Sequence, residues 1–446
     1  MDTEQRQFLD DILSGMRSGR ITRRTFLERA TLLGLTSTSA LSLLEACGGS
    51  ASGANTLVWQ SENDTSNTYG KLTEAFNTTV GKKNNIAVVW RQGPNSTDDL
   101  LTRYTTTLRA RGTSIDILSL DVVYPAQFAA NAWIQPLDKF WTPEERKNYL
   151  QSPLQACTYQ GKLWAAPFRT DIGLLYYRSD LLSHPPKTWE ELSNVARTLQ
   201  PQTKYGFVWQ GAQYEGLVCN FAEVLHSYGG AVLDTKDPTN IKVNDARGRA
   251  ALSTMVNWVG TISPDAVITY QEQQSLDVFK SGDALFMRNW PFAIAISNDA
   301  KQSRIPRQFE IGALPAGDKE GTGHSTIGGW NLAINAFLPE ERARAAWEFI
   351  KYMLSPEAQK IAALKATFTV TLASIYGDAD VLKQHPEFAR FKPILEQSQP
   401  RPVSPKYTAV SNAIQKHIFR ALKHQVTPVE ALANLETELN NIINPR

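Results

Sequence analysis

Alternation of β-rich runs with helical segments is the feature that most limits what this chain can fold into. Three short runs rich in branched and aromatic residues lie at residues 56–60, 86–90 and 115–120. Tyr69, Leu72 and Phe76 recur at helical spacing after the first run, and Ser96 is placed to cap a helix after the second. Strands spaced about 30 residues apart with helices between them predict right-handed crossovers and a parallel sheet. We therefore expect an α/β lobe over this part of the chain.

The later sequence predicts a second α/β lobe and a return to the first. Residues 156–167 have the pattern of a hairpin that turns at Gln160 and Gly161, and the apolar run 174–178 leads into new structure. Gly328 and Gly329 open a strand-like run where the backbone must bend or approach another group closely. Further strands are expected at 206–210 and 283–289, and helices at 214–228, 245–262, 271–281, 339–354, 355–364, 405–423 and 427–443.

Residues 1–46 differ from the rest of the chain. Arg23 and Arg24 precede residues 30–44, which carry no charge and end shortly before Cys47. A membrane span needs about 20 mostly apolar residues, so this shorter stretch is more typical of a targeting segment. The pattern resembles a twin-arginine lipoprotein signal, which implies cleavage before Cys47 and a lipid on that residue. Residues 47–55 would then form a flexible tether, whereas an amphipathic N-terminal helix is the alternative.

Composition and motifs argue against several classes of function. Lys and Arg number 46 against 44 Asp and Glu, and no run of like charges favours a nucleic-acid partner. The chain has no phosphate-binding Gly-rich loop, and its six scattered histidines form no metal-binding pair, so we expect no metal and no cofactor. Cys157 and Cys219 could form a disulfide or remain isolated buried thiols.

Aromatic and polar residues gather at the ends of predicted strands and at predicted crossings between lobes, where open α/β sheets bind ligands. A carboxylate accepts hydrogen bonds from neighbouring hydroxyls, and an aromatic face packs on the C–H side of a sugar ring, so the mixture suits a carbohydrate. The groups are Trp59 with Glu62 and Asn63, Asp121 with Tyr124, Arg169 with Asp171, Trp290 with Phe292, and Trp330.

An ordered set of motifs runs across the chain: Arg169-Thr-Asp-Ile-Gly-Leu-Leu-Tyr-Tyr-Arg178, Thr188-Trp-Glu-Glu-Leu192, Tyr214-Glu-Gly-Leu217, Met287-Arg-Asn-Trp-Pro-Phe292, Gly328-Gly-Trp330, Ala346-Trp-Glu-Phe-Ile350, Ser355-Pro-Glu-Ala-Gln359 and Arg401-Pro-Val403. Together with the leader and tether, this set resembles the bacterial extracellular solute-binding proteins of ABC importers, in their trehalose/maltose-binding branch. The resemblance implies an α/β, two-lobed periplasmic-binding-protein fold of type II, with the ligand in a cleft between lobes. Three crossovers would fall at 168–173, 326–331 and 367–376, with one lobe at 56–168 and 329–370 and the other at 173–326 and 375–446.

The same resemblance implies which residues contact the sugar: Glu62, Asp121, Asp171, Trp290, Phe292, Trp330 and Arg401. Arg169 stands where an aromatic residue is common, and Phe292 stands where a tyrosine is often found. The implied function is a non-catalytic lipoprotein, anchored outside the cytoplasm, that hands a disaccharide such as trehalose or maltose to the transmembrane subunits of an ABC permease. The alternative is a secreted carbohydrate hydrolase that uses two of the carboxylates Glu62, Asp121 and Asp171 as a catalytic pair.

Overall fold

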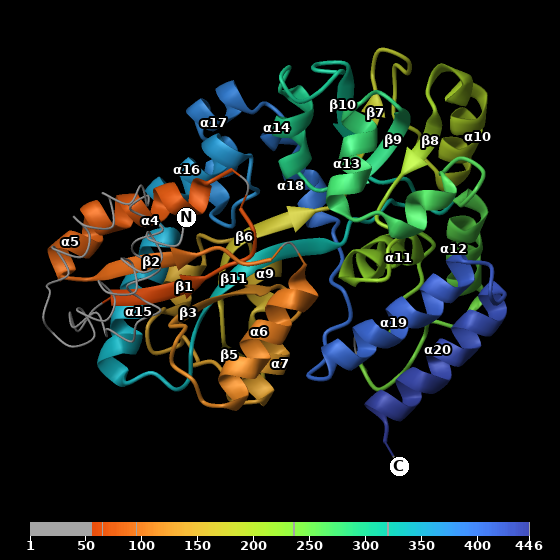
Figure 1. Ribbon diagram of the computed structural model, residues 1–446. Coiled ribbons are helices and arrows are strands. Elements are labelled where there is room, and N and C mark those ends of the chain that lie inside the picture. Colours follow the sequence, from red (N-terminus) through yellow and green to blue (C-terminus); the bar gives the residue numbers. More distant parts are fainter. Residues whose placement is uncertain (1–55, 65, 95, 235–236, 319–320, 446) are drawn as a thin grey trace, which may run out of the picture. The chain divides into compact units, whose positions relative to one another are not determined.

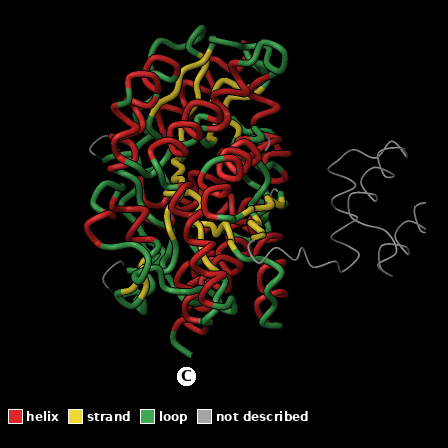
Figure 2. Tube along the Cα trace, turned by 90° about the vertical axis from the view of Figure 1, so that its left-hand side faces the viewer, coloured by secondary structure: helices red, strands yellow, loops and turns green. Residues whose placement is uncertain are grey.

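The computed structural model describes residues 56–445 apart from 65, 95, 235–236 and 319–320. The predicted leader with Arg23 and Arg24, and the predicted tether with Cys47, lie outside the described residues. No helix of the described part is long and apolar enough to span a bilayer. In Figure 2 the strands lie among surrounding helices.

The first sheet contains five strands in the order β2-β1-β3-β11-β6 (Figure 1). β1 pairs with β3 in parallel, as predicted, but β11 is antiparallel to both β3 and β6. The parallel pairing predicted for residues 56–120 is confirmed for β1 and β3, and β11 adds antiparallel pairs when it returns to this sheet from a distant part of the sequence. The strands are β1 (Thr56–Gln60), β2 (Ala87–Arg91), β3 (Ile117–Asp121), β6 (Ala166–Ile172) and β11 (Ile327–Ile334).

The second sheet contains four strands in the order β10-β7-β9-β8. β7 is antiparallel to β10 and β9, whereas β8 is parallel to β9. The strands are β7 (Leu174–Arg178), β8 (Tyr205–Val208), β9 (Ala284–Asn289) and β10 (Phe309–Gly312). The predicted hairpin is present as β4 (Thr158–Tyr159) and β5 (Lys162–Leu163), and both turn residues have positive φ angles, 48° at Gln160 and 72° at Gly161.

Helices connect the strands and begin where the sequence supplies a cap. The Ser96 and Ser355 hydroxyls accept backbone N–H groups at the starts of α6 and α16, and Thr427 forms a capping box with Glu430. The helices are α4 (Thr68–Thr78), α5 (Val80–Asn84), α6 (Thr97–Arg109), α7 (Pro125–Ala130), α8 (Pro143–Arg146), α9 (Gln151–Ala156), α10 (Trp189–Leu199), α11 (Glu215–Ser227), α12 (Ala246–Trp258), α13 (Glu272–Lys280), α14 (Phe292–Asn298), α15 (Glu340–Met353), α16 (Pro356–Ala366), α17 (Ala379–Gln384), α18 (Phe388–Glu396), α19 (Tyr407–Leu422) and α20 (Pro428–Ile443).

Two buried apolar clusters hold these elements. The first cluster packs on the first sheet through residues such as Trp59 and Phe349 and continues onto the second sheet through Tyr176. The second cluster includes Phe207 and Trp258 and joins the second sheet to α11, α12, α19 and α20. Removing apolar surface from water stabilises the folded state by about 25 cal/mol per Å², so these clusters are the main source of stability.

Three chain segments lie side by side where the chain passes between the two sheets. Gly173 separates β6 of the first sheet from β7 of the second. The Ser325 hydroxyl donates to the Gly173 carbonyl at 2.6 Å, just before β11. Gln399 then bonds to both neighbours of Thr326, because its N–H donates to the Ser325 carbonyl and its carbonyl accepts from the Ile327 N–H. Residues 369 and 370, within the third predicted crossover, instead lie against Thr170 and Arg169 of β6.

Candidate functional site

The pairing register of the first sheet places Asp121, Trp330 and Arg169 in one row across three neighbouring strands. Trp330 of β11 lies opposite Asp121 of β3 and opposite Arg169 of β6, and Asp171 lies opposite Gly328. Directly opposite residues of antiparallel strands project from the same face of a sheet. The row therefore places an indole between a carboxylate and a guanidinium.

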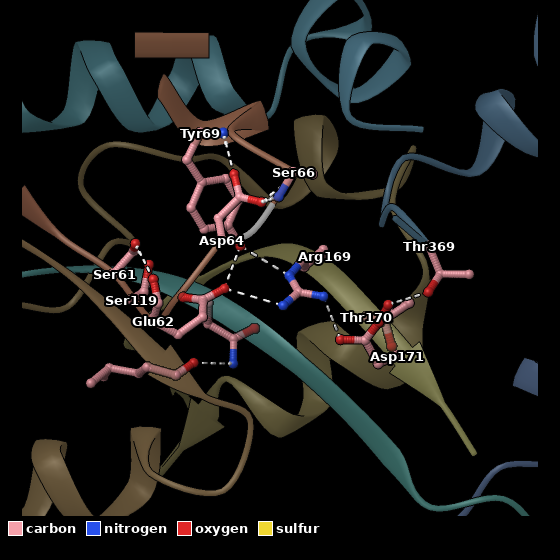
Figure 3. A network of polar contacts seen from close by, with 12 residues as sticks. Ser61, Glu62, Asp64, Ser66, Tyr69, Ser119, Arg169, Thr170, Asp171 and Thr369 are labelled. Carbon is pink, nitrogen blue, oxygen red and sulfur yellow. Dashed lines mark hydrogen bonds and ion pairs between the residues drawn. The ribbon is translucent and has the colours of Figure 1, made fainter. Parts of the chain in front are cut away.

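Arg169 is the centre of a buried polar network (Figure 3). Its guanidinium donates to the Asp171 carboxylate at 2.7 Å and to Glu62 Oε1 at 3.1 Å, and its Nε donates to the Tyr69 hydroxyl at 3.0 Å. The Tyr69 hydroxyl in turn donates to Glu62 Oε1. Phe368 packs 4.4 Å from the guanidinium carbon, measured to the ring centroid. Two of the predicted ligand carboxylates thus share one arginine.

Burial dominates the electrostatics of both carboxylates in this network. Loss of water raises the pKa of Glu62 and of Asp171 above the ordinary values, while Arg169 opposes the rise. The second oxygen of Glu62, Oε2, is buried and makes no hydrogen bond to any described group. Glu62 Oε2 can therefore still accept a hydrogen bond, and it lies beside the row of Asp121, Trp330 and Arg169.

Arg401 joins carboxylates from two different parts of the fold. Its guanidinium donates to Asp121 Oδ1 at 2.8 Å and to Glu215 Oε1 at 2.6 Å. Asp121 ends β3 of the first sheet, whereas Glu215 begins α11, which packs in the second cluster. The Arg401 side chain is only 2% exposed. Burial raises the pKa of Glu215 to about 7, against the attraction of Arg401.

Trp290 lies at the end of β9, partly exposed and contacted by charged groups. The guanidinium carbon of Arg288 lies 3.8 Å from the centroid of its ring, and its indole N–H donates to Glu272 Oε1 at 3.2 Å. A β-carbon added to Gly328 would lie 3.1 Å from the edge of the Trp290 ring and 3.1 Å from the Asp171 β-carbon. The glycine therefore permits the close approach of β11 to Trp290 that its position in the sequence suggested.

Phe292 and Trp330 are the other predicted aromatic contacts, and both are partly exposed. Both also pack against the first apolar cluster. Trp59 and Tyr124, by contrast, are 0% and 3% exposed. These two belong to the core, so the hypothesis that they are ligand-facing aromatics was wrong.

The structure brings five of the seven predicted residues into three adjoining groups, while Trp330 lies opposite Asp121 in the sheet and Phe292 packs against the first apolar cluster. Glu62 and Asp171 meet at Arg169, Asp121 meets Arg401, and Asp171 approaches Trp290 through Gly328. Sequence reasoning missed the partners that complete these groups, which are Tyr69, Glu215, Glu223, Glu272 and Arg288. Arg288 carried a readable signal, because an arginine that directly follows four apolar strand residues requires a buried partner.

The sulfur and metal chemistry of the described residues is sparse. Cys157 and Cys219 are buried free thiols, which decides between the two alternatives for this pair. Within residues 56–445, apart from the gaps stated above, no group of three or more His, Cys, Asp or Glu side chains could hold a metal ion. The chemistry available at the three groups is hydrogen bonding by charged side chains and packing on indole faces.

Comparison with known proteins identifies the family. Residues 61–360 match the family described as bacterial extracellular solute-binding protein. The chain belongs to this family. A probable ABC transporter-binding protein of Deinococcus radiodurans is 35% identical over 376 residues, covering 81% of this chain and 88% of the relative. The maltotriose-binding protein of Pyrococcus abyssi is 27% identical over 304 residues, covering 67% and 63% of the two chains.

Solved structures show the same fold in this family. The maltose-bound MalE3 protein of T. maritima superposes with a TM-score of 0.81 at 34% identity, covering 86% of this chain and 99% of that one. The solute-binding protein described here accordingly has the predicted α/β, two-lobed fold of type II periplasmic binding proteins. The exact lobe boundaries remain predictions.

Proposed function

We propose that this solute-binding protein captures a sugar between its two lobes and delivers it to the transmembrane subunits of an ABC permease. The expected ligand is a disaccharide such as trehalose or maltose. The observation that carries the proposal is the pairing of partly exposed indoles, Trp290 and Trp330, with the carboxylates Asp121 and Asp171. Indoles offer the apolar face of a pyranose a surface, and carboxylates accept its hydroxyl hydrogens.

The similarity to sugar-binding relatives supports the same ligand class. One similar protein is named as maltotriose-binding, and another is known in a maltose-bound structure. Hydrogen bonds to charged groups contribute roughly 1.5–3 kcal/mol each, and micromolar binding corresponds to about 8 kcal/mol. Several such bonds with one stacked ring therefore suffice for micromolar affinity after ordering costs are subtracted.

A panel of sugars tests this function directly. We expect trehalose, maltose or maltotriose to raise the melting temperature of the protein beginning at Gly48, and glycerol at the same concentration to leave it unchanged. A ligand present at 100 times its dissociation constant adds about 2.7 kcal/mol to the free energy of unfolding. Absence of any shift across the panel would contradict sugar binding. Release of glucose from maltose or trehalose would instead support the hydrolase alternative.

We also propose that the protein is exported by the twin-arginine route and held outside the cytoplasm by a lipid on Cys47. The tether would then leave the folded lobes free to meet the permease. Cys47→Ser should abolish incorporation of a labelled fatty acid, because the thiol is the attachment point, while Cys157→Ser serves as a matched control. Label retained by Cys47→Ser at the same segment would contradict this attachment.

Export is expected to depend on Arg23 and Arg24, because twin-arginine signals are read by a receptor. Replacing both arginines with lysine keeps the charge and should still retain the protein in the cytoplasm. Normal export of that double variant would contradict the proposed route.

A further inference from the structure

Trp290 is held at its N–H edge by a carboxylate that is itself fixed. Glu272 Oε1 accepts the indole N–H at 3.2 Å, and Glu272 Oε2 accepts the Tyr214 hydroxyl at 2.7 Å. Both oxygens of one carboxylate are thus engaged, one by the indole and one by a buried tyrosine. The indole N–H has no donor capacity left for a ligand.

A second contact restrains the ring from one face. Arg288 lies against the indole and is itself fixed, because its side chain is 1% exposed and donates two hydrogen bonds to the Glu223 carboxylate and one to Gln210. A cation over an indole face is attracted by the negative charge density of that face. With one face occupied by Arg288 and the N–H edge by Glu272, the opposite face is the part of Trp290 that can receive a sugar.

The carboxylate comes from a different element than the indole, and the two elements are bonded together. Glu272 is the first residue of α13, whereas Trp290 follows β9. The Asn289 side-chain amide donates to the Glu272 carbonyl at 3.0 Å, and its oxygen accepts the Trp290 backbone N–H at 2.9 Å. Leu276 and Phe279 anchor α13 in the core. The geometry at Glu272 is therefore set by the fold and not by a mobile loop.

We propose that Glu272 is a positioning residue that fixes the stacking face of Trp290, an inference that rests on the sugar-binding function proposed above. An indole without its N–H acceptor can turn about its side-chain bonds, and a sugar must then order the ring as it binds. Pre-organisation by Glu272 removes that cost. Trp290 consequently contacts the sugar through its ring face alone, and the site gains no hydrogen bond from the indole.

Maltose affinity in matched variants of the full chain tests the proposal, with trehalose or maltotriose used if it binds more tightly. Glu272→Ala should weaken binding about tenfold, the equivalent of one lost charged hydrogen bond. Glu272→Gln should stay within about threefold of the natural protein, because the amide oxygen can still accept the indole N–H. Asp277→Ala, which removes an exposed carboxylate from the same helix, should change nothing.

A double-mutant cycle with Trp290→Phe separates positioning from direct contact. Phenylalanine keeps an aromatic face but has no N–H, so adding Glu272→Ala to it should weaken binding less than about twofold. The sugar-induced change in tryptophan fluorescence that Trp290→Phe removes should also shrink in Glu272→Ala and recover in Glu272→Gln. A substitution that only lowers the unfolding free energy would not change the coupling between Glu272 and Trp290 in the double-mutant cycle. It would also leave the sugar-induced fluorescence change of the folded protein as it is.

Each contrary result identifies what has failed. If Trp290→Ala weakens binding and Glu272→Ala does not, the positioning role is overturned while the sugar site stands. If the Glu272→Ala loss persists in the Trp290→Phe background, Glu272 acts on the ligand directly and the proposal is wrong. If no sugar binds the natural protein, or if Trp290→Ala binds normally, the proposed sugar site at Trp290 fails and the inference fails with it.

Discussion

Three arginines, Arg169, Arg288 and Arg401, organise the charged side chains around the candidate site. Arg288 and Arg401 are buried, the Arg169 side chain is 11% exposed, and each contacts at least one carboxylate at 2.8 Å or less. Removing one partner of such a pair leaves the other as an uncompensated buried charge, at a cost of about 3–5 kcal/mol. The arginines therefore fix the positions of acceptors that must remain available to a ligand.

Trp290→Ala should lower sugar affinity about tenfold or more, with a loss of roughly 1–3 kcal/mol in binding free energy, by analogy with stacked bases and interface indoles. The physical reason is loss of the ring face that packs on the pyranose. Calorimetric titration of the variant with maltose measures this loss, and denaturant unfolding without sugar should show a much smaller change. Trp290 can be removed at modest cost to folding because it is partly exposed.

Trp59→Ala is the matched control for Trp290→Ala. Trp59 is 0% exposed and donates to the Ser119 hydroxyl at 3.0 Å, so truncation should cost about 3–5 kcal/mol of unfolding free energy. Sugar affinity of the fraction that remains folded should be nearly unchanged. The reverse pattern, with Trp290→Ala unfolding the protein and leaving affinity intact, would make Trp290 a core residue.

The raised pKa of Glu215 predicts that the free energy of unfolding depends on pH. The carboxyl group has an ordinary pKa of 4.5, which burial raises to about 7 in the folded protein. Between those two values the folded protein holds a proton that the unfolded chain has released, so the free energy of unfolding should fall as pH rises through this window. Glu215→Gln should remove a fall of about 1–3 kcal/mol between pH 5 and 7.5, measured by urea unfolding.

Only the difference between natural protein and variant isolates this effect. Burial lowers the pKa of His226 to about 4, so His226 contributes stability that rises with pH above that value and opposes the trend from Glu215. Both proteins share that contribution, and it cancels. Glu144→Gln, at an exposed position, is the control for removing a carboxylate. Equal pH profiles for the natural protein and Glu215→Gln would show that the Glu215 carboxyl group does not titrate in this window.

Sequence reasoning at the residue scale could identify the aromatic and acidic candidates but not their partners. Trp290 is followed by Pro291 at the end of an apolar run, and that local pattern is visible in the sequence. The bond between Trp290 and Glu272, or between Arg401 and Asp121, joins residues whose proximity only the tertiary fold creates. Local spacing carries no information about such pairs.

At the scale of elements, most predicted strands and helices are present because their signals are local. The short edge strand β10 and the helix α14 were missed, since the first offers only four residues and the second follows directly on a motif interpreted as a binding feature. The parallel direction of β1 and β3 was predicted, whereas the direction of β11 was not. β11 pairs with β3 more than 200 residues away, and no local pattern specifies the direction of so distant a pairing.

Gly329 is the position at which one residue decides the geometry of a strand pair. Its φ angle is 131°, and an added β-carbon would lie 2.4 Å from the Arg169 carbonyl oxygen on β6. Gly329→Ala should therefore cost about 1–3 kcal/mol or more of unfolding free energy and shift the row that contains Trp330. Gly377→Ala, where an added β-carbon meets nothing within 4 Å, should be nearly neutral. Equal urea midpoints for the two variants would contradict this role of Gly329.

At the scale of the whole folded chain, contacts join elements that belong to different sheets and clusters. Arg401 bonds both Asp121 and Glu215, and the Gln127 side chain at α7 accepts the Thr408 N–H of α19 at 3.0 Å. These bonds favour the arrangement in which the two parts are close. Sugar contacts proposed for both parts would favour the same arrangement, because a ligand shifts the equilibrium toward the state that it binds better.

The last prediction concerns closure, measured by small-angle scattering. Saturating maltose, or whichever sugar of the panel binds, should lower the radius of gyration, because residues of both lobes contact one ligand only when the lobes approach. Arg401→Gln should begin more open without sugar and show a larger decrease, since it lacks the ion pairs to Asp121 and Glu215. Arg344→Gln, which breaks only an exposed pair with Glu340, should behave as the natural protein does. A radius of gyration that sugar leaves unchanged in both the natural protein and Arg401→Gln, with binding shown by calorimetry, would mean that capture occurs without lobe movement.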